Sequence, residues 1–292
     1  MSLLAPSLLQ KLGRARLNPR RAVASSGIGE RRSRAKGAGI EFEDHRPYQI
    51  GDDIRHLDRH VHGRLGQHVV KQFAAYQQLP ITILLDASAS MGYGAPQKLG
   101  HAKALAAGLA YAGLAGGDQV LMGAFAGRRL EWHSRVHGPR RLASVVPWLE
   151  ALRPVSSTDL ARTARGAVPR LLSEGLAIII SDFMVENVEE ALAVLESVRQ
   201  EVVCVHVLAP EEIEPDRVGT GDIRFIDLES GQEVETSLDE TMYGRYRDAL
   251  EAWSLELRDL VHDHHGRYLR VRSDDDLERI FLREWRTEGL IG

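Results

Sequence analysis

The fold of this chain is decided by the stretch ITILLDASASMG, residues 81–92. Its first five residues are apolar or β-branched, a pattern typical of a strand buried on both faces of a parallel sheet. The run stops at Asp86, and small hydroxyl residues follow at alternate positions, Ser88 and Ser90. Ligands of open parallel sheets bind beyond the carboxyl ends of strands, so we expect a site here. Three hard oxygen donors on one tight turn favour magnesium, manganese or calcium over zinc.

Strands and helices alternate along the chain that follows. The apolar periodicity predicts strands at 119–125, 130–136, 176–181, 202–208 and 268–271, a hairpin at 222–237, and helices at 98–115, 138–152, 159–172, 188–200, 240–264 and 275–286. Pro147 lies inside one of these helices, where we expect a kink or a break. The alternation predicts an α/β fold with a doubly wound, mainly parallel sheet and helices on both faces.

Asp86, Ser88 and Ser90 form an Asp-x-Ser-x-Ser motif after an apolar strand. This motif resembles the first part of the metal-ion-dependent adhesion site (MIDAS) of von Willebrand factor A domains. The resemblance implies a threonine from a second loop and an aspartate from a later strand, and Thr158 and Asp182 occupy those places. From the sequence alone, Thr158 could instead cap the helix that follows it, and Ser88 or Ser90 could cap a solvated turn.

A second motif precedes this strand, and it resembles the domain-of-unknown-function family fifty-eight. The family pattern is a phenylalanine followed by Arg-x-Tyr-x-x-Gly-Asp-Asp-x-Arg-x-x-Asp, just upstream of a von Willebrand A domain. The matching residues, which the resemblance implies to be structural or docking residues, are Phe42, Arg46, Tyr48, Gly51, Asp52, Asp53, Arg55 and Asp58. Arg59 departs from the pattern, because the family usually has a tryptophan there, and losing the indole removes a large apolar anchor.

These motifs divide the chain into three parts. We expect a basic and partly flexible N-terminal arm at 1–38, a family-specific segment at 39–78 that packs on the A domain, and a von Willebrand A-like domain at 79–292 that ends in a hairpin and helices. Residues 1–36 contain nine Lys or Arg and one acid, Glu30. Such an arm could bind nucleic acid, fold back on its own body or dock on an acidic partner.

Composition sets the remaining limits. The chain is 43% hydrophobic and 27% charged, which is ordinary for a soluble globular protein. No apolar run approaches the roughly 18–20 residues that span a bilayer, and the N-terminus lacks the pattern of a secretory signal. We therefore expect a cytoplasmic protein. The one cysteine, Cys204, lies in an apolar run, so we expect a buried and inert thiol.

The resemblance implies a non-catalytic adaptor that binds protein partners through a divalent ion. Mg²⁺, or Mn²⁺ or Ca²⁺ in its place, would be held by Asp86, Ser88, Ser90, Thr158 and Asp182, with one coordination position open to a partner's Asp or Glu. Genes of the family usually lie beside those of MoxR-type AAA+ ATPases, so such an ATPase or its client is the implied partner in protein complex assembly or maturation.

Two alternatives use the same sequence differently. A strand-end aspartate with magnesium also begins the site of phosphoryl-transferring enzymes, in which Asp86 would be the nucleophile. Those enzymes usually need a second carboxylate two residues on, and Ser88 stands there. The other alternative is nucleic-acid binding by the basic arm, but the arm has no interleaved aromatic residues for base stacking. The sequence leaves open the client, the preferred ion and the oligomeric state.

Overall fold

The structure is a computed structural model, and it describes residues 3–20, 31–49, 57–58, 61, 63–64, 66, 68–155, 157–172, 174–219, 221–226 and 232–292. For residues 31–46, 71–77, 218, 225 and 236–238 it describes the backbone only. The chain divides into two compact units: Met1–Arg21 together with Pro80–Gly292, here called the sheet unit, and Ala22–Leu79, here called the hairpin unit. The arm expected at 1–38 is thus divided between the two units.

The hairpin unit contains two long antiparallel strands, β1 (Arg31–Pro47) and β2 (Val69–Gln77), whose register shifts in three places. Tyr48 follows β1, and its backbone N–H donates to the carbonyl of His68. Asp58 is buried, and its backbone N–H donates to the carbonyl of Val69. Of the other family-motif residues, Phe42 and Arg46 lie in β1, whereas Gly51, Asp52, Asp53 and Arg55 lie outside the described residues.

The sheet unit is built around a mainly parallel sheet in the order β11-β8-β7-β3-β4-β5, with β6 paired to β4. Its strands β11, β8, β7, β3 and β4 are parallel to their neighbours, and β5 and β6 run antiparallel to β4. The bounds are β3 Pro80–Asp86, β4 Gln119–Ala126, β5 Arg129–Trp132, β6 Val136–His137, β7 Gly175–Ser181, β8 Gln200–Leu208 and β11 Arg267–Arg272. All residues of β3, β7 and β8 are buried, as expected for strands covered on both faces.

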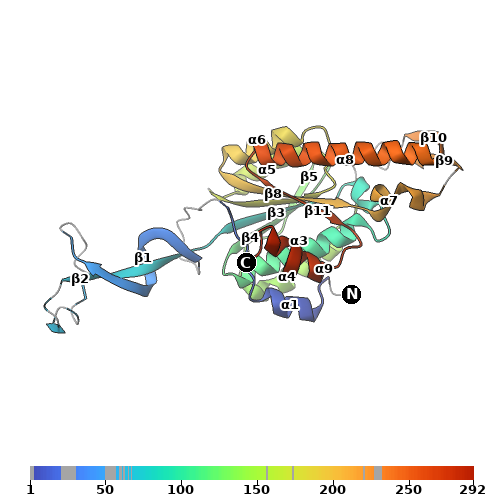
Figure 1. The fold of residues 1–292 in the computed structure, drawn as a ribbon. Coiled ribbons are helices and arrows are strands. Elements are labelled where there is room, and N and C mark those ends of the chain that lie inside the picture. The colour runs from blue at the N-terminus through green and yellow to red at the C-terminus, as the bar shows by residue number, and fades with distance from the viewer. Residues whose placement is uncertain are drawn as a thin grey trace. The chain divides into compact units, whose positions relative to one another are not determined.

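Helices cover both faces of this sheet (Figure 1). One face carries α5 (Leu160–Ala167), α6 (Val188–Ser197) and α8 (Glu240–Asp263), and the other carries α1 (Pro6–Leu12), α3 (Lys98–Ala115) and α4 (Leu142–Ala151). The remaining elements are α7 (Pro210–Ile213), β9 (Gly221–Ile226), β10 (Glu233–Leu238), α9 (Leu277–Arg279), α10 (Trp285–Thr287) and short 3-10 or π turns. The fold class expected from the sequence, an α/β fold with a mainly parallel sheet, is confirmed.

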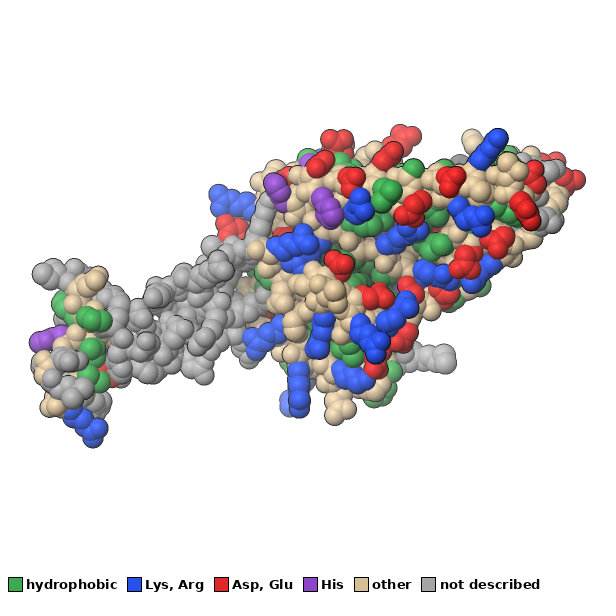
Figure 2. All heavy atoms as spheres, in the orientation of Figure 1, with side chains coloured by type: hydrophobic (Ala, Val, Ile, Leu, Met, Phe, Trp, Pro, Cys, Tyr) green, Lys and Arg blue, Asp and Glu red, His purple; other side chains and the backbone are tan. Residues whose placement is uncertain are grey.

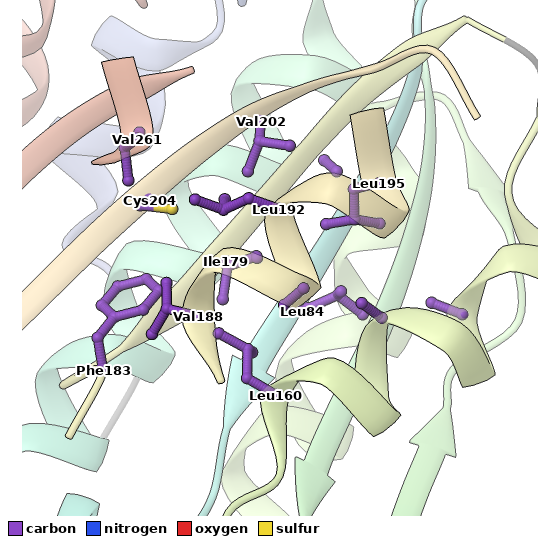
Figure 3. Close-up of a cluster of buried hydrophobic side chains, with 14 of the residues drawn as sticks. Leu84, Leu160, Ile179, Phe183, Val188, Leu192, Leu195, Val202, Cys204 and Val261 are labelled. Atoms are coloured by element: carbon purple, nitrogen blue, oxygen red, sulfur yellow. The ribbon is translucent and has the colours of Figure 1, made fainter. Parts of the chain in front are cut away.

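The core on the α5, α6 and α8 face is mainly aliphatic and also contains the buried rings of Phe125 and Phe183; Figure 3 labels Phe183. Leu84 and Ile179 come from neighbouring strands, Leu192 from α6, and Phe183 from the loop that follows β7. Cys204 belongs to this cluster, and burial raises the pKa of its thiol, which agrees with the expected buried thiol. The loop after β7 is therefore anchored in the core one residue beyond Asp182.

The opposite face depends on close packing of α3. A Cβ atom on Gly108 would lie 2.3 Å from Cζ of Phe281, so only glycine lets the C-terminal segment approach this helix so closely. Phe281 in turn packs edge-on against Trp285. Trp285 is 2% exposed, so both aromatic rings of this pair are buried in the core.

The surface of the sheet unit mixes both signs of charge along α8, as Figure 2 shows. Ion pairs such as Arg270–Glu251 and Arg258–Asp259 account for part of this pattern. None of the described helices combines the length and the apolar character needed to cross a bilayer.

Candidate metal centre at the ends of β3 and β7

The polar residues singled out in the sequence meet at a topological switch point of the sheet. From β3 the chain passes through α3 to β4 on one side, whereas from β7 it passes through α6 to β8 on the other side. Because the two connections leave in opposite directions, the region beyond the carboxyl ends of β3 and β7 is where open sheets of this kind place a ligand, and it is here called the crevice. Asp86 ends β3, Ser181 ends β7, and Asp182 follows directly.

Asp86 is 1% exposed and accepts hydrogen bonds at both carboxylate oxygens. Its Oδ1 accepts from the backbone N–H of Ser88 at 2.8 Å and from the Thr158 hydroxyl at 3.0 Å. Its Oδ2 accepts from the Ser181 hydroxyl at 2.6 Å. Three separate segments of the chain therefore converge on one carboxylate.

The two serines of the motif lie beside this carboxylate. The hydroxyl oxygens of Ser88 and Ser90 are 3.0 Å apart; Ser88 is buried and Ser90 is half-buried. The loop that carries Thr158 is fastened to the same edge, because the N–H of Val155 donates to the carbonyl of Ala87 at 2.9 Å. The helix cap expected as the alternative for Thr158 is made by Asp159 instead, whose carboxylate accepts from the N–H of Arg162.

Only neutral donors of the described residues bind the carboxylate of Asp86, so its negative charge is only partly stabilised. Burial, together with the negative charge of Asp182, raises its pKa to about 6, although hydrogen bonds from Ser181 and Ser88 act in the opposite direction. Hydroxyl and amide donors stabilise a carboxylate less than a cation does. A group that stays ionised at neutral pH in such surroundings attracts an external cation.

Asp182 lies in different surroundings, because a buried lysine binds it. The Lys98 ammonium, at the start of α3, donates to Asp182 Oδ2 at 2.8 Å and to Glu212 Oε1 at 2.6 Å, and all three side chains are buried. Burial alone would lower the pKa of Lys98, but the charges of Asp182 and Glu212 raise it above its ordinary value. Glu212 is held in turn by the N–H of Ala209, which donates to its Oε2 at 2.6 Å.

Sequence reasoning missed Ser181, Lys98 and Glu212. Ser181 directly precedes Asp182 at the end of an apolar strand, so its hydroxyl was placed to join the same edge. Lys98 begins a helix that was expected to be buried, and a lysine is almost never fully buried without a partner. Glu212 gave no comparable signal, because it follows Glu211 in a short polar run that reads as solvent-exposed.

The donor set fits a small divalent cation. Magnesium takes oxygen ligands at about 2.0–2.1 Å in an octahedron, so neighbouring ligand oxygens lie about 2.9 Å apart. The Ser88–Ser90 and Thr158–Asp86 oxygen pairs, each at 3.0 Å, have this spacing. Within the described part of the chain, no three or more His, Cys, Asp or Glu side chains are grouped to hold a metal. Any ion here would therefore depend on hydroxyl oxygens.

Fold and crevice together define an α/β protein with a mainly parallel sheet and a cluster of oxygen donors at its switch point. The chain belongs to the family described as Protein of unknown function DUF58, which it matches over residues 44–254.

Its relatives include Uncharacterized protein Mb1516 of Mycobacterium bovis and Uncharacterized protein Rv1480 of Mycobacterium tuberculosis. Each is 29% identical over 248 residues, which cover 82% of this chain and 77% of the relative.

Two solved structures are similar at lower identity. An aerotolerance-related membrane protein from Bacteroides fragilis, crystallised with multiple mutations to serines, is 22% identical, with a TM-score of 0.45 over 66% of this chain and 91% of that one. Proximal thread matrix protein 1 from the mussel byssus is 15% identical, with a TM-score of 0.35 over 44% of this chain and 35% of that one.

Proposed function

We propose that the sheet unit is a von Willebrand A-like, metal-dependent binding module. The observation that carries this proposal is the state of Asp86: a buried carboxylate surrounded by hydroxyl and amide donors, with no cation from the described chain bound to it. Asp86, Ser88, Ser90 and Thr158 would hold Mg²⁺, and Asp182 would act on it through its charge or through water. The ion would supply an electrophilic coordination position for an oxygen ligand from outside.

The charges around the crevice favour an acidic partner. Lys98 already binds Asp182, so among the described residues Asp86 is the one carboxylate of the proposed ligand set without a bound cation. A divalent ion neutralised mainly by one carboxylate keeps positive charge, which attracts an Asp or Glu side chain of another protein. The half-buried Ser90 and Thr158 form the open side of the donor cluster.

Phosphoryl transfer has weaker support. As a nucleophile, Asp86 would have to reach a phosphorus atom, but it is 1% exposed and both of its oxygens accept hydrogen bonds. The chain offers Ser88 where such enzymes carry a second carboxylate for acid–base work.

We further propose, from the family resemblance, that the partner is a MoxR-type AAA+ ATPase or its client, and that this protein is an adaptor in complex assembly or maturation. The test is a pull-down of the cognate ATPase with wild-type protein, Asp86→Ala and the exposed control Asp263→Ala, each with Mg²⁺ and with EDTA. We expect capture by wild type and the control only when Mg²⁺ is present. Equal capture with and without Mg²⁺ would contradict a metal-dependent dock.

A further inference from the structure

Arginines are concentrated in one part of the sheet unit. Residues 126–170 contain nine arginines and three acids, giving a net charge of +6, whereas residues 182–264 contain 22 acids and six arginines. The nine are Arg128, Arg129, Arg135, Arg140, Arg141, Arg153, Arg162, Arg165 and Arg170. The protein is therefore strongly asymmetric in charge despite a net charge of only −4.

The nine arginines fall into groups at opposite edges of the sheet. Four follow or begin elements at the edge where β3 ends, and they are here called the rim arginines: Arg128, Arg129, Arg153 and Arg162. Another group lies near the opposite edge, where β6 pairs with the start of β4 through Val136 and Val120. This second group includes Arg140 and Arg141, in the turn just after β6.

The rim arginines form no ion pair with a carboxylate among the described residues, and the same holds for Arg140 and Arg141. All four are exposed. Several other arginines of the sheet unit do pair with acids, as in Arg199–Glu174 and Arg272–Glu214. The one rim side chain with recorded hydrogen bonds is Arg153, which donates to the backbone carbonyls of Glu150 and Leu152.

Two of the rim arginines, Arg129 and Arg153, line a groove that extends to Ala87 beside the proposed metal site. The groove has a volume of about 230 Å³, and Arg129, Arg153, Trp148, Val155 and Ala87 line it. Ala87 stands between Asp86 and Ser88, so one end of the groove adjoins the proposed metal site. Glu131 also lines the groove and is its one acidic residue.

We propose that the rim arginines and this groove form the docking surface for an acidic segment of a partner protein. The inference rests on the proposed function and extends it: one carboxylate of the segment reaches the ion, and its acidic neighbours bind the guanidinium groups. Guanidinium forks match carboxylates in geometry and charge. A short segment also fits better than a long polyanion, since the acids concentrated in residues 182–264 of the same unit oppose an anion that extends beyond the rim.

The test measures binding of a fluorescein-labelled hexa-glutamate peptide by anisotropy, with Mg²⁺ and with EDTA. The rim variant is Arg128→Gln with Arg129→Gln, and the matched control is Arg140→Gln with Arg141→Gln, a second adjacent and exposed pair. We expect the rim variant to lose about fivefold or more in peptide affinity, since it removes two exposed guanidinium–carboxylate pairs. The control should change by less than about twofold, and Mg²⁺ uptake measured by calorimetry should stay unchanged in both variants.

The outcomes separate this inference from the metal-dependent function. Wild-type binding that is the same with Mg²⁺ and EDTA, yet still falls in the rim variant, would support the docking surface and contradict the metal dependence. Equal losses in rim and control variants, or no peptide binding by wild type, would overturn the docking surface. Tighter binding of an oligo(U) probe would assign the arginines to nucleic acid, and a dimer lost only in the rim variant would assign them to a second copy; either result would overturn the inference.

Discussion

Two buried aspartates lie at neighbouring strand ends of the same sheet, and they are neutralised differently. Asp182, after β7, binds the ammonium of Lys98 at 2.8 Å. Asp86, at the end of β3, receives only hydroxyl and amide hydrogen bonds from the described residues, and burial helps to raise its pKa to about 6. The two residues have similar burial, so exposure does not explain the contrast.

The difference indicates that the negative charge of Asp182 is neutralised within the described chain, whereas that of Asp86 is not. A buried carboxylate with its own lysine is a structural group, because the pair is satisfied within the chain. A buried carboxylate with only neutral donors is stable as an anion when a cation is supplied from outside. The following experiments test this contrast, from the largest expected effect to the smallest.

The largest effect is expected from removing the lysine. Lys98→Met leaves Asp182 and Glu212 buried without their cation, so we expect the free energy of unfolding to fall by about 3–5 kcal/mol. Urea denaturation of the metal-free protein measures it. The control is Lys103→Met, one turn further along α3, whose half-buried side chain donates to the carbonyl of Leu152; we expect a loss below about 1 kcal/mol there. Equal losses of unfolding free energy in the two variants would show that the buried ion pairs of Lys98 contribute no more to stability than the single hydrogen bond of Lys103.

The next effect is a pH dependence caused by Asp86. Its pKa is raised from 3.8 to about 6 in the folded protein, so the folded state binds more protons than the unfolded state between these values. The stability contributed by protonated Asp86 is therefore present below about pH 4 and is lost as pH rises through about 6, a change of about 3 kcal/mol.

Asp86→Asn should lack this loss. Urea denaturation in EDTA at several pH values from 4 to 7.5, plotted as wild type minus variant, isolates the contribution of Asp86 from other titrating groups. As pH rises, we expect the free energy of unfolding of wild type to fall relative to that of the variant. Adding Mg²⁺ at pH 7 should restore the stability of wild type. A flat difference would mean that Asp86 is already compensated in the folded protein.

The smallest effect concerns Lys98, whose ammonium is shared by Asp182 and Glu212. Glu212→Gln leaves the Lys98 ammonium to Asp182 alone, so less negative charge faces the crevice and Mg²⁺ affinity should fall about threefold to fivefold. Lys98→Met should change affinity in the opposite direction, because it frees the charge of Asp182. Calorimetric titration measures both, with Glu211→Gln as the control on the same short helix. Weakened affinity in both Lys98→Met and Glu212→Gln would indicate general loss of packing instead.

Much of the fold followed from hydrophobic periodicity. The helix expected at 98–115 coincides with α3, and the strand expected at 176–181 lies within β7 at 175–181. Elements with weaker patterns differ. The strand expected at 130–136 is divided into β5 and β6, and the helix expected from 159 to 172 ends at Ala167. Pro169 lies just beyond that end, where its missing N–H and its ring oppose further helix.

A kink or a break was expected at Pro147, and the structure shows no break there. The helix α4 begins later than expected, at Leu142, and continues through Pro147 to Ala151. Because α4 starts only five residues earlier, the proline removes one hydrogen bond near the amino end, where few intrahelical bonds have yet formed. Periodicity alone does not locate where a helix begins, so it could not show that the proline lies this close to the start.

Most of the oxygen donors around Asp86 could be selected from the sequence, but the Ser181 hydroxyl and the neutralisation of Asp182 by Lys98 could not. Motif spacing brought out Asp86, Ser88, Ser90, Thr158 and Asp182, and the structure places all five at one sheet edge. That Lys98 neutralises Asp182 depends on how α3 and α7 pack against β7, which is a property of tertiary structure. Half of the family motif, Gly51, Asp52, Asp53 and Arg55, lies outside the described residues, so its role stays a prediction.

The central claim is that an external divalent cation completes the charge balance of Asp86. Calorimetric titration of Mg²⁺ into wild type and Asp86→Asn at pH 7 tests it most directly. We expect saturable uptake of one ion per chain by wild type and none by the variant, with wild-type affinity about tenfold weaker at pH 5, where a proton competes for Asp86. Absence of uptake of Mg²⁺ and Mn²⁺ by wild type, or equal uptake by the variant, would contradict it.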